Sequence, residues 1–159
     1  MTRSGQHTDE VCRANRPLLS SRGWREHFYA TIIPVHPSRS PSLATKDPRE
    51  PFTRITVQEA KEKLDAGTAV MVDVRNPDEY VEIHAKGVRL IPVNTVMNEV
   101  KQIRSYAGDK AEVLFICKSG QRSALAAEYA TAAGLDDKEL FNVEGGTTAW
   151  ATAGLPTGD

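Results

Sequence analysis

A cysteine that ends an apolar strand and opens a short polar loop is the residue of this chain best placed to do chemistry. The apolar run 113–116 precedes it, an alanine-rich run that predicts a helix follows it, and the loop reads Cys117-Lys118-Ser119-Gly120-Gln121-Arg122-Ser123. The first N–H groups of such a helix point back at the sulfur and, together with the cations Lys118 and Arg122, favour the thiolate over the thiol. We therefore predict that Cys117 is a nucleophile with a lowered pKa and that the amides of residues 118–123 bind an anion.

A free cysteine at the end of a strand can also be a small buried apolar residue without chemistry. A cysteine of that kind does not need a glycine three residues later, a cation on either side of the glycine, or a helix that starts at once. Taken together, these features are typical of an anion-binding nest. They favour a reactive Cys117.

Two further segments carry recognisable patterns. The apolar run 69–74 ends in polar residues at Asp73 and Arg75 and is followed by the turn 76–79, and the C-terminal run 143–150 contains a Gly-Gly pair and a tryptophan. With the cysteine loop, these segments resemble the rhodanese family of sulfurtransferases, and the resemblance covers about residues 53–157. Other positions match the family in order and spacing: Glu79-Tyr80, His84, Gly87, Ile91-Pro92 and Gly154-Leu155-Pro156.

The resemblance implies a rhodanese-like three-layer α/β fold and a thiosulfate sulfurtransferase that uses no cofactor and no metal. Cys117 would be the catalytic residue and hold the transferred sulfur as a persulfide, and Asp73 and Arg75 would support the loop. The loop residues that would bind the substrate are Lys118, Ser119, Gly120, Gln121, Arg122 and Ser123. The expected partners are a small-molecule donor such as thiosulfate and an acceptor: cyanide, a thioredoxin-like protein or a sulfur-carrier protein.

The chain departs from the family pattern at two places. It reads Ile83-His84-Ala85 where the family commonly has Gly-His-Ile, so we expect a local repacking of that turn. Lys118 stands where thiosulfate-using members often have arginine. Lysine keeps the charge but lacks the planar fork of arginine, which predicts a weaker and less directional grip on an oxyanion.

The chemistry of sulfur transfer needs a thiolate and does not need a general base. We therefore expect His84 to pack and to donate hydrogen bonds, and Trp150 to belong to the core. We expect Arg75 to pair with Glu79 or Asp78, and Asp73 to accept hydrogen bonds from the cysteine loop.

Alternating apolar strands and amphipathic helices predict a mainly parallel central sheet flanked by helices, with the site beyond the carboxyl ends of the strands. A capping box formed by Thr56 and Glu59 predicts the first helix, and Gly67 ends it. The predicted strands lie at Ile55 and over 69–74, 89–92, 113–116 and 139–143. The predicted helices lie over 57–66, 78–83, 95–106 and 123–133, with a short one that carries Trp150.

The charge is distributed unevenly along the chain of 159 residues, whose net charge is −1. We predict that residues 1–50 form a disordered basic extension rich in Arg, Ser and Pro, and that residues 51–159 form a single domain. A targeting presequence and a start assigned too far upstream stay open for the extension. No apolar run approaches the roughly 18 residues of a membrane helix, so we expect no membrane binding. The arginines of the extension alternate with acidic residues and form no dense basic block, so we expect no nucleic-acid binding. Cysteine is scarce, which favours the cytoplasm. We expect a monomer.

Two other classes of function compete with sulfur transfer. The first is a phosphatase or arsenate reductase, because the dual-specificity cell-cycle phosphatases share the rhodanese fold; their loop is one residue longer between cysteine and arginine. This chain has Lys118 to Gln121 between Cys117 and Arg122, which predicts a cradle too small for a tetrahedral phosphate. The second is a non-catalytic rhodanese-like binding module. Such modules usually lack the cysteine, which this chain retains.

Overall fold

The computed structural model describes residues 44–110 and 112–158, so the extension predicted for residues 1–50 falls mostly outside the described residues. Five strands form one sheet in the order β1–β5–β4–β2–β3, and every pair of neighbours is parallel. The strands are β1 (Thr53–Ile55), β2 (Ala69–Asp73), β3 (Arg89–Leu90), β4 (Glu112–Ile116) and β5 (Leu140–Val143). This arrangement confirms the predicted α/β fold with a parallel central sheet.

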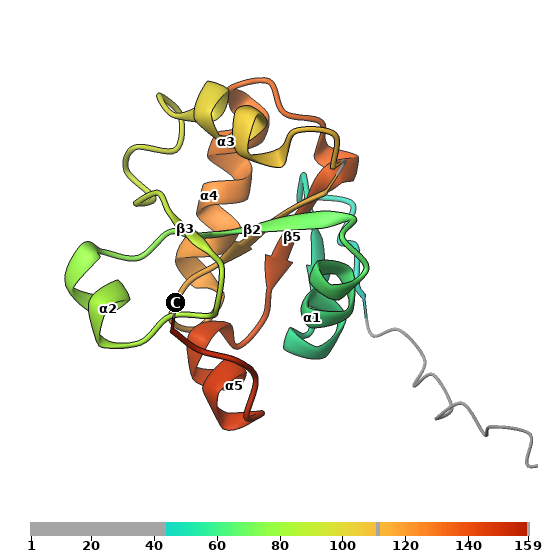
Figure 1. The fold of residues 1–159 in the computed structure, drawn as a ribbon. Coiled ribbons are helices and arrows are strands. Elements are labelled where there is room, and N and C mark those ends of the chain that lie inside the picture. Colours follow the sequence, from blue (N-terminus) through green and yellow to red (C-terminus); the bar gives the residue numbers. More distant parts are fainter. Residues whose placement is uncertain (1–43, 111, 159) are drawn as a thin grey trace, which may run out of the picture. The chain divides into compact units, whose positions relative to one another are not determined.

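Helices cover both faces of the sheet (Figure 1). Buried residues of α3 and α4 share one apolar cluster with one face, and buried residues of α1 and α5 share a second cluster with the other face. The helices are α1 (Val57–Asp65), α2 (Pro77–Glu82), α3 (Val100–Ala107), α4 (Gln121–Ala132) and α5 (Gly146–Thr152), with a 3₁₀ turn at Asp137–Glu139. None of the described helices is long and apolar enough to cross a membrane.

The central strands are buried on both faces, as parallel strands between helices must be. In β4, Val113 and Phe115 pack into the cluster of α3 and α4, whereas Leu114 and Ile116 pack into that of α1 and α5. Because side chains alternate along a strand, Cys117 continues the series of Val113 and Phe115 and points to the α4 side. The alternation of side chains along β4 therefore places the Cys117 sulfur on the face of the sheet that α4 covers.

Local signals placed most elements correctly. The capping box is formed, because the Glu59 amide donates to Thr56 Oγ1 at 3.2 Å and the Thr56 amide donates to Glu59 Oε2 at 2.9 Å. The helix predicted over 95–106 is shorter and begins at Val100, after a turn in which the Thr95 hydroxyl donates to the Pro92 carbonyl at 2.8 Å. The strand predicted over 89–92 ends at Leu90, although the Ile91 amide still donates to the Asp73 carbonyl at 2.9 Å.

Residues just before the predicted domain boundary at 51 also contact the sheet. Thr45 and Arg54 form an antiparallel bridge with backbone hydrogen bonds of 2.9 and 2.8 Å, and Lys46 lies 3.2 Å from Asp137. A chain shortened to begin at Pro51 loses these contacts, whereas one that begins at Ala44 keeps them. We expect the shorter chain to be less stable by about 1–2 kcal/mol, the net worth of two backbone hydrogen bonds. Urea unfolding of both chains measures the difference; equal midpoints would contradict it.

Candidate active site

Cys117 lies directly after β4, at the carboxyl end of the strand, and only 1% of its surface is exposed. The Gly120 amide donates to Cys117 Sγ at 3.1 Å, and Ser123 Oγ lies 3.3 Å from the same sulfur. The loop 117–123 therefore closes around its own cysteine. This is the cradle that the sequence predicts.

Gly120 makes that closure feasible. Its φ of 102° lies in the left-handed region, and Gly120 is the residue that caps the N-terminus of α4. A side chain in this conformation is strained, so glycine is the natural residue here. The turn delivers the first N–H groups of a helix of 12 residues to the sulfur.

The outer side of the loop is held by α5. The Thr147 amide donates to the Cys117 carbonyl at 2.8 Å, and the Thr148 amide donates to the Lys118 carbonyl at 3.2 Å. With their carbonyls bound to α5, the peptides of the loop can turn their N–H groups inward. The Gly-Gly pair at the start of α5 belongs to the site for this reason, whereas the sequence predicts it only as part of a family pattern.

The hydrogen bonds of the loop set the acidity of the thiol. Burial acts to raise the pKa of Cys117, but hydrogen bonds from the Ser123 hydroxyl and from the amides of Ser123, Ser119 and Gly120 outweigh it, so the pKa lies below its ordinary value. The charge of Arg122 also interacts favourably with the thiolate. The side chain of Lys118 is exposed. Hydrogen bonds, more than the cations that the sequence emphasised, thus favour the thiolate.

Arg122 is bound by a carboxylate from another helix. Its guanidinium meets Glu79 of α2 through two contacts of 2.6 and 2.7 Å. Hydrogen bonding to Arg122 is the main cause that lowers the pKa of Glu79 to about 2. This pair corrects the expectation that Glu79 binds Arg75. It ties the start of α4 to α2 and fixes the direction of Arg122.

Asp73 and Arg75 form a buried pair with each other. Arg75 Nη2 lies 2.7 Å from Asp73 Oδ2, and Nη2 also donates to the Ile83 carbonyl at 2.6 Å. The expectation that Asp73 accepts hydrogen bonds from the cysteine loop is therefore wrong: among the residues that the structure describes, Arg75 alone donates to its carboxylate. The pair lies beside the loop, because Asp73 is in register with Ile116. It fixes the end of β2 to the end of α2.

Two other predicted roles are confirmed. The ring of His84 stacks on Tyr80 with centroids 3.9 Å apart, and its Nδ1 donates a hydrogen bond to the Tyr80 carbonyl at 2.8 Å. Trp150 is 2% exposed and donates from its indole to the Pro156 carbonyl at 2.8 Å. Both side chains therefore stabilise the fold around the site.

Asn142 of β5 belongs to the site, although the sequence analysis did not select it. It is fully buried, and its Oδ1 accepts the Ser123 hydroxyl at 2.6 Å. Its Nδ2 has no hydrogen-bond partner among the described residues. The only signal in the sequence is a polar residue inside the otherwise apolar strand 140–143.

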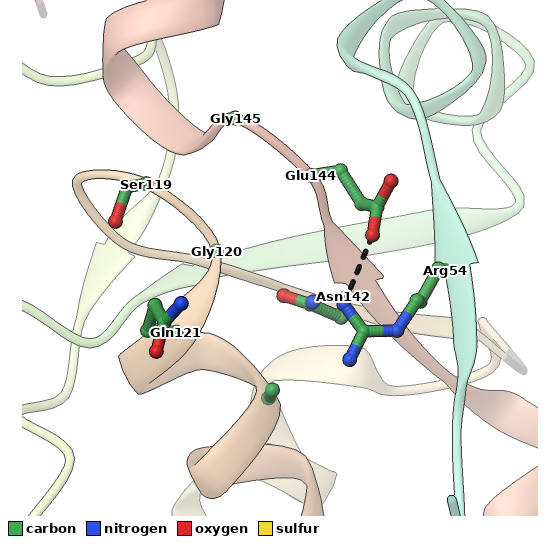
Figure 2. A pocket seen from close by; sticks show the side chains of 8 residues that line it. Arg54, Ser119, Gly120, Gln121, Asn142, Glu144 and Gly145 are labelled. Carbon is green, nitrogen blue, oxygen red and sulfur yellow. Dashed lines mark hydrogen bonds and ion pairs between the residues drawn. The ribbon is translucent and has the colours of Figure 1, made fainter.

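A hollow of about 400 Å³ adjoins the loop on the side of β1 and β5 (Figure 2). Asn142 lines it, and its charged residues are already paired: Arg54 lies 2.9 Å from Glu144 and 2.5 Å from Glu50. The other lining residues are Ser119, Gly120, Gln121, Ala124 and Gly145. Gln121, one of the predicted substrate contacts, thus borders this hollow, as does Gly120, whose amide donates to the Cys117 sulfur.

Removing the charge of Glu79 should destabilise the fold in a pH-dependent way. A carboxyl whose pKa is lowered to about 2 adds stability above its ordinary pKa of 4.5 and loses it as the pH falls through 2. The pair is partly exposed, so we expect Glu79→Gln to cost about 1 kcal/mol at pH 7 and almost nothing at pH 2.

Urea unfolding at both pH values measures this effect. Glu82→Gln, on the same helix, is the matched control and should leave the midpoint unchanged. A loss of stability at pH 2 as large as at pH 7 would show that the charge of Glu79 is not the cause.

Comparisons with known proteins agree with this geometry. The model of the rhodanese-like domain family matches residues 56–153. The "Probable adenylyltransferase/sulfurtransferase MoeZ" of Mycobacterium tuberculosis is 36% identical over 98 residues, which are 61% of this chain and 24% of that relative, so the chain spans about a quarter of its length.

Solved structures show the same likeness. A rhodanese-like domain protein of Staphylococcus aureus is 33% identical, with a TM-score of 0.52 over 61% of this chain and 89% of that one. A Rhodopseudomonas palustris protein described as a "Possible Tyrosine Phosphatase" is 29% identical, with a TM-score of 0.56 over 64% and 80%. From the matched family model and from the cysteine cradle at the end of β4, we conclude that the chain belongs to the rhodanese-like domain family.

Proposed function

We propose that the protein is a sulfurtransferase in which Cys117 takes a sulfane sulfur from an anionic donor such as thiosulfate. The observation that carries the proposal is the cradle itself: Gly120 N–H and the Ser123 hydroxyl reach the buried sulfur at 3.1 and 3.3 Å, and the pKa of Cys117 is lowered. A thiolate so stabilised is a nucleophile that needs no base beside it.

The transfer proceeds by two displacements at sulfur. The Cys117 thiolate attacks the outer sulfur of thiosulfate, a new S–S bond forms, and sulfite leaves with the electron pair of the bond that breaks. The persulfide Cys117–S–S⁻ carries its charge on the terminal sulfur. A nucleophilic acceptor then attacks that sulfur, and the Cys117 thiolate leaves and returns to its original state.

The loop supports both displacements. Its amides stabilise sulfur anions without reorganising, because α5 already holds their carbonyls. Lys118 is exposed and can meet the sulfonate of the donor, whereas Arg122 is engaged by Glu79 at 2.6 Å. Lys118 would therefore be the first cation that an incoming anion meets.

We infer the partners from the same chemistry. A thiophilic acceptor such as cyanide, a thioredoxin-like protein or a sulfur-carrier protein would remove the terminal sulfur. A reducing compartment such as the cytoplasm would keep Cys117 free for the next cycle.

Intact-mass measurement after incubation with thiosulfate or mercaptopyruvate tests the proposal. We expect a gain of one sulfur atom on Cys117, located by peptide mapping and removed by cyanide. A phosphatase of the same fold is the alternative, and it is measured in parallel with an aryl phosphate. Hydrolysis of the aryl phosphate that depends on Cys117, with no gain of sulfur from either donor, would overturn the proposal.

A further inference from the structure

Ser123 and Asn142 form a chain of hydrogen bonds behind the reactive sulfur. Ser123 Oγ lies 3.3 Å from Cys117 Sγ and 2.6 Å from Asn142 Oδ1, and Ser123 and Asn142 are both fully buried. A serine hydroxyl has a single proton, so it can donate to the sulfur or to the amide oxygen, but not fully to both. The direction of donation along this chain of hydrogen bonds therefore depends on whether Cys117 Sγ and the Asn142 amide each donate or accept.

One of the two directions suits a neutral thiol. The Ser123 hydroxyl then donates to Asn142 Oδ1 at 2.6 Å, and the thiol completes the chain by donating its own S–H to Ser123 Oγ. The amide nitrogen of Asn142 is then left without an acceptor, although it is buried. A buried N–H group in this position is unusual and carries a free-energy penalty.

A thiolate requires the opposite direction. It has no proton, so the Ser123 hydroxyl must turn to the sulfur, and Asn142 Oδ1 then loses its donor. Half a turn of the amide about its Cβ–Cγ bond exchanges oxygen and nitrogen at nearly the same positions. Asn142 Nδ2 can then donate to Ser123 Oγ, and Oδ1 takes the place where the nitrogen had no partner.

We propose that Asn142 is a positioning residue whose amide turns when Cys117 ionises, so that Asn142 Nδ2 donates to Ser123 Oγ and the Ser123 hydroxyl donates to the thiolate. No covalent bond changes except S–H, whose proton leaves to solvent. In a persulfide, the same chain of hydrogen bonds would contact Cys117 Sγ, which is bonded to the terminal sulfur. The inference goes beyond the proposed function, since it concerns ionisation of the thiol with or without a sulfur donor.

The charged groups around this chain come from every neighbouring element, and most are paired with each other. Arg122 of α4 meets Glu79 of α2, and Asp73 meets Arg75 at the end of β2. On the side of the hollow, Arg54 of β1 meets Glu144 after β5, as Figure 2 shows, while Lys118 is exposed. Cys117, which contacts Ser123, is the group that gains or loses a proton.

The pH dependence of alkylation tests the proposal in the full-length chain. Cys12→Ser leaves Cys117 as the only thiol, so the rate of reaction with iodoacetamide against pH gives the midpoint of Cys117 ionisation. Asn142→Asp introduces a carboxylate of the same shape that accepts and does not donate. We expect it to raise the midpoint by about one pH unit or more, a roughly tenfold loss of thiolate near neutral pH.

A second background separates the hydrogen-bond chain from the charge of the new carboxylate. In Ser123→Ala the chain is broken, so Asn142→Asp should shift the midpoint by less than half as much as it does beside Ser123. Equal shifts in the two backgrounds would overturn the proposal. No sulfur donor takes part, so the outcome is independent of whether the persulfide forms.

Nuclear magnetic resonance of the unsubstituted side chain covers the case in which a variant fails to fold. In the Cys12→Ser protein, the Nδ2 protons of Asn142 should move with the same midpoint as alkylation and exchange more slowly above it, because they gain an acceptor. In a protein that also carries Cys117→Ser they should not titrate. Side-chain amide signals of Asn142 that stay constant while Cys117 ionises would refute the turn of the amide.

Discussion

Replacing Cys117 with serine should abolish sulfur transfer and leave the fold intact. The persulfide can form only on sulfur, and a hydroxyl neither ionises near neutral pH nor attacks sulfane sulfur, so we expect turnover to fall by at least about 10³-fold. Serine is close to cysteine in shape and can accept the Gly120 amide that now points to Sγ. Turnover with thiosulfate and cyanide, followed as thiocyanate, measures the loss.

Two controls make this result interpretable. Cys12→Ser should keep full turnover, which shows that the effect belongs to Cys117 and not to thiols in general. The melting temperature of Cys117→Ser should stay close to that of the unsubstituted protein. Sustained turnover in the Cys117→Ser protein would remove the proposed mechanism.

The sequence predicts the cysteine cradle because its determinants are local. An apolar strand, a glycine three residues after the cysteine, and an alanine-rich helix lie next to each other in the chain, and the structure joins them through the Gly120 amide. The capping box at Thr56 is local in the same way, since both of its hydrogen bonds join residues three apart. Signals of this kind depend on backbone geometry that neighbours in sequence determine.

The partners of the arginines could not be predicted in this way. Arg75 has carboxylates close by in sequence on both sides, and its spacing to the turn that follows predicts a pair with Glu79 or Asp78. In the fold, Arg75 is buried at the end of β2 against Asp73, and Glu79 is taken by Arg122, which is 43 residues away in sequence. Which ion pair forms depends on how closely α2 approaches α4. The packing of both helices on the whole sheet determines the distance between them.

Asn142 shows a second limit of local reasoning. A polar residue within a short strand has no mark of function until β5 is placed next to β4 and Ser123 is brought above it. The strand order β5–β4 is what sets the amide of Asn142 behind Cys117. Its role in the site is therefore a consequence of topology.

Replacing Gly146 with alanine should be among the most damaging single changes near the site. A Cβ at this position would lie 2.2 Å from the Cys117 carbonyl oxygen, and 2.5 and 2.6 Å from the carbonyl carbon and oxygen of Lys118. These atoms are backbone and cannot rotate away, so α5 must separate from the loop. The hydrogen bond from Thr147 N–H to the Cys117 carbonyl would then be lost. We expect a loss of about 3 kcal/mol or more in the free energy of unfolding.

Gly154→Ala is the matched control, because the two glycines share a left-handed backbone and differ in their surroundings. Gly146 has a φ of 56° and Gly154 a φ of 66°, but no atom lies within 4 Å of a Cβ at Gly154. Gly154→Ala should therefore cost only the conformational strain, about 1–2 kcal/mol, and leave the alkylation rate of Cys117 unchanged. Gly146→Ala should exceed that cost in urea unfolding and also slow alkylation at neutral pH, since the amides that stabilise the thiolate shift with the loop. Equal stabilities and equal alkylation rates for the two variants would show that close contact with α5 does not hold the cradle.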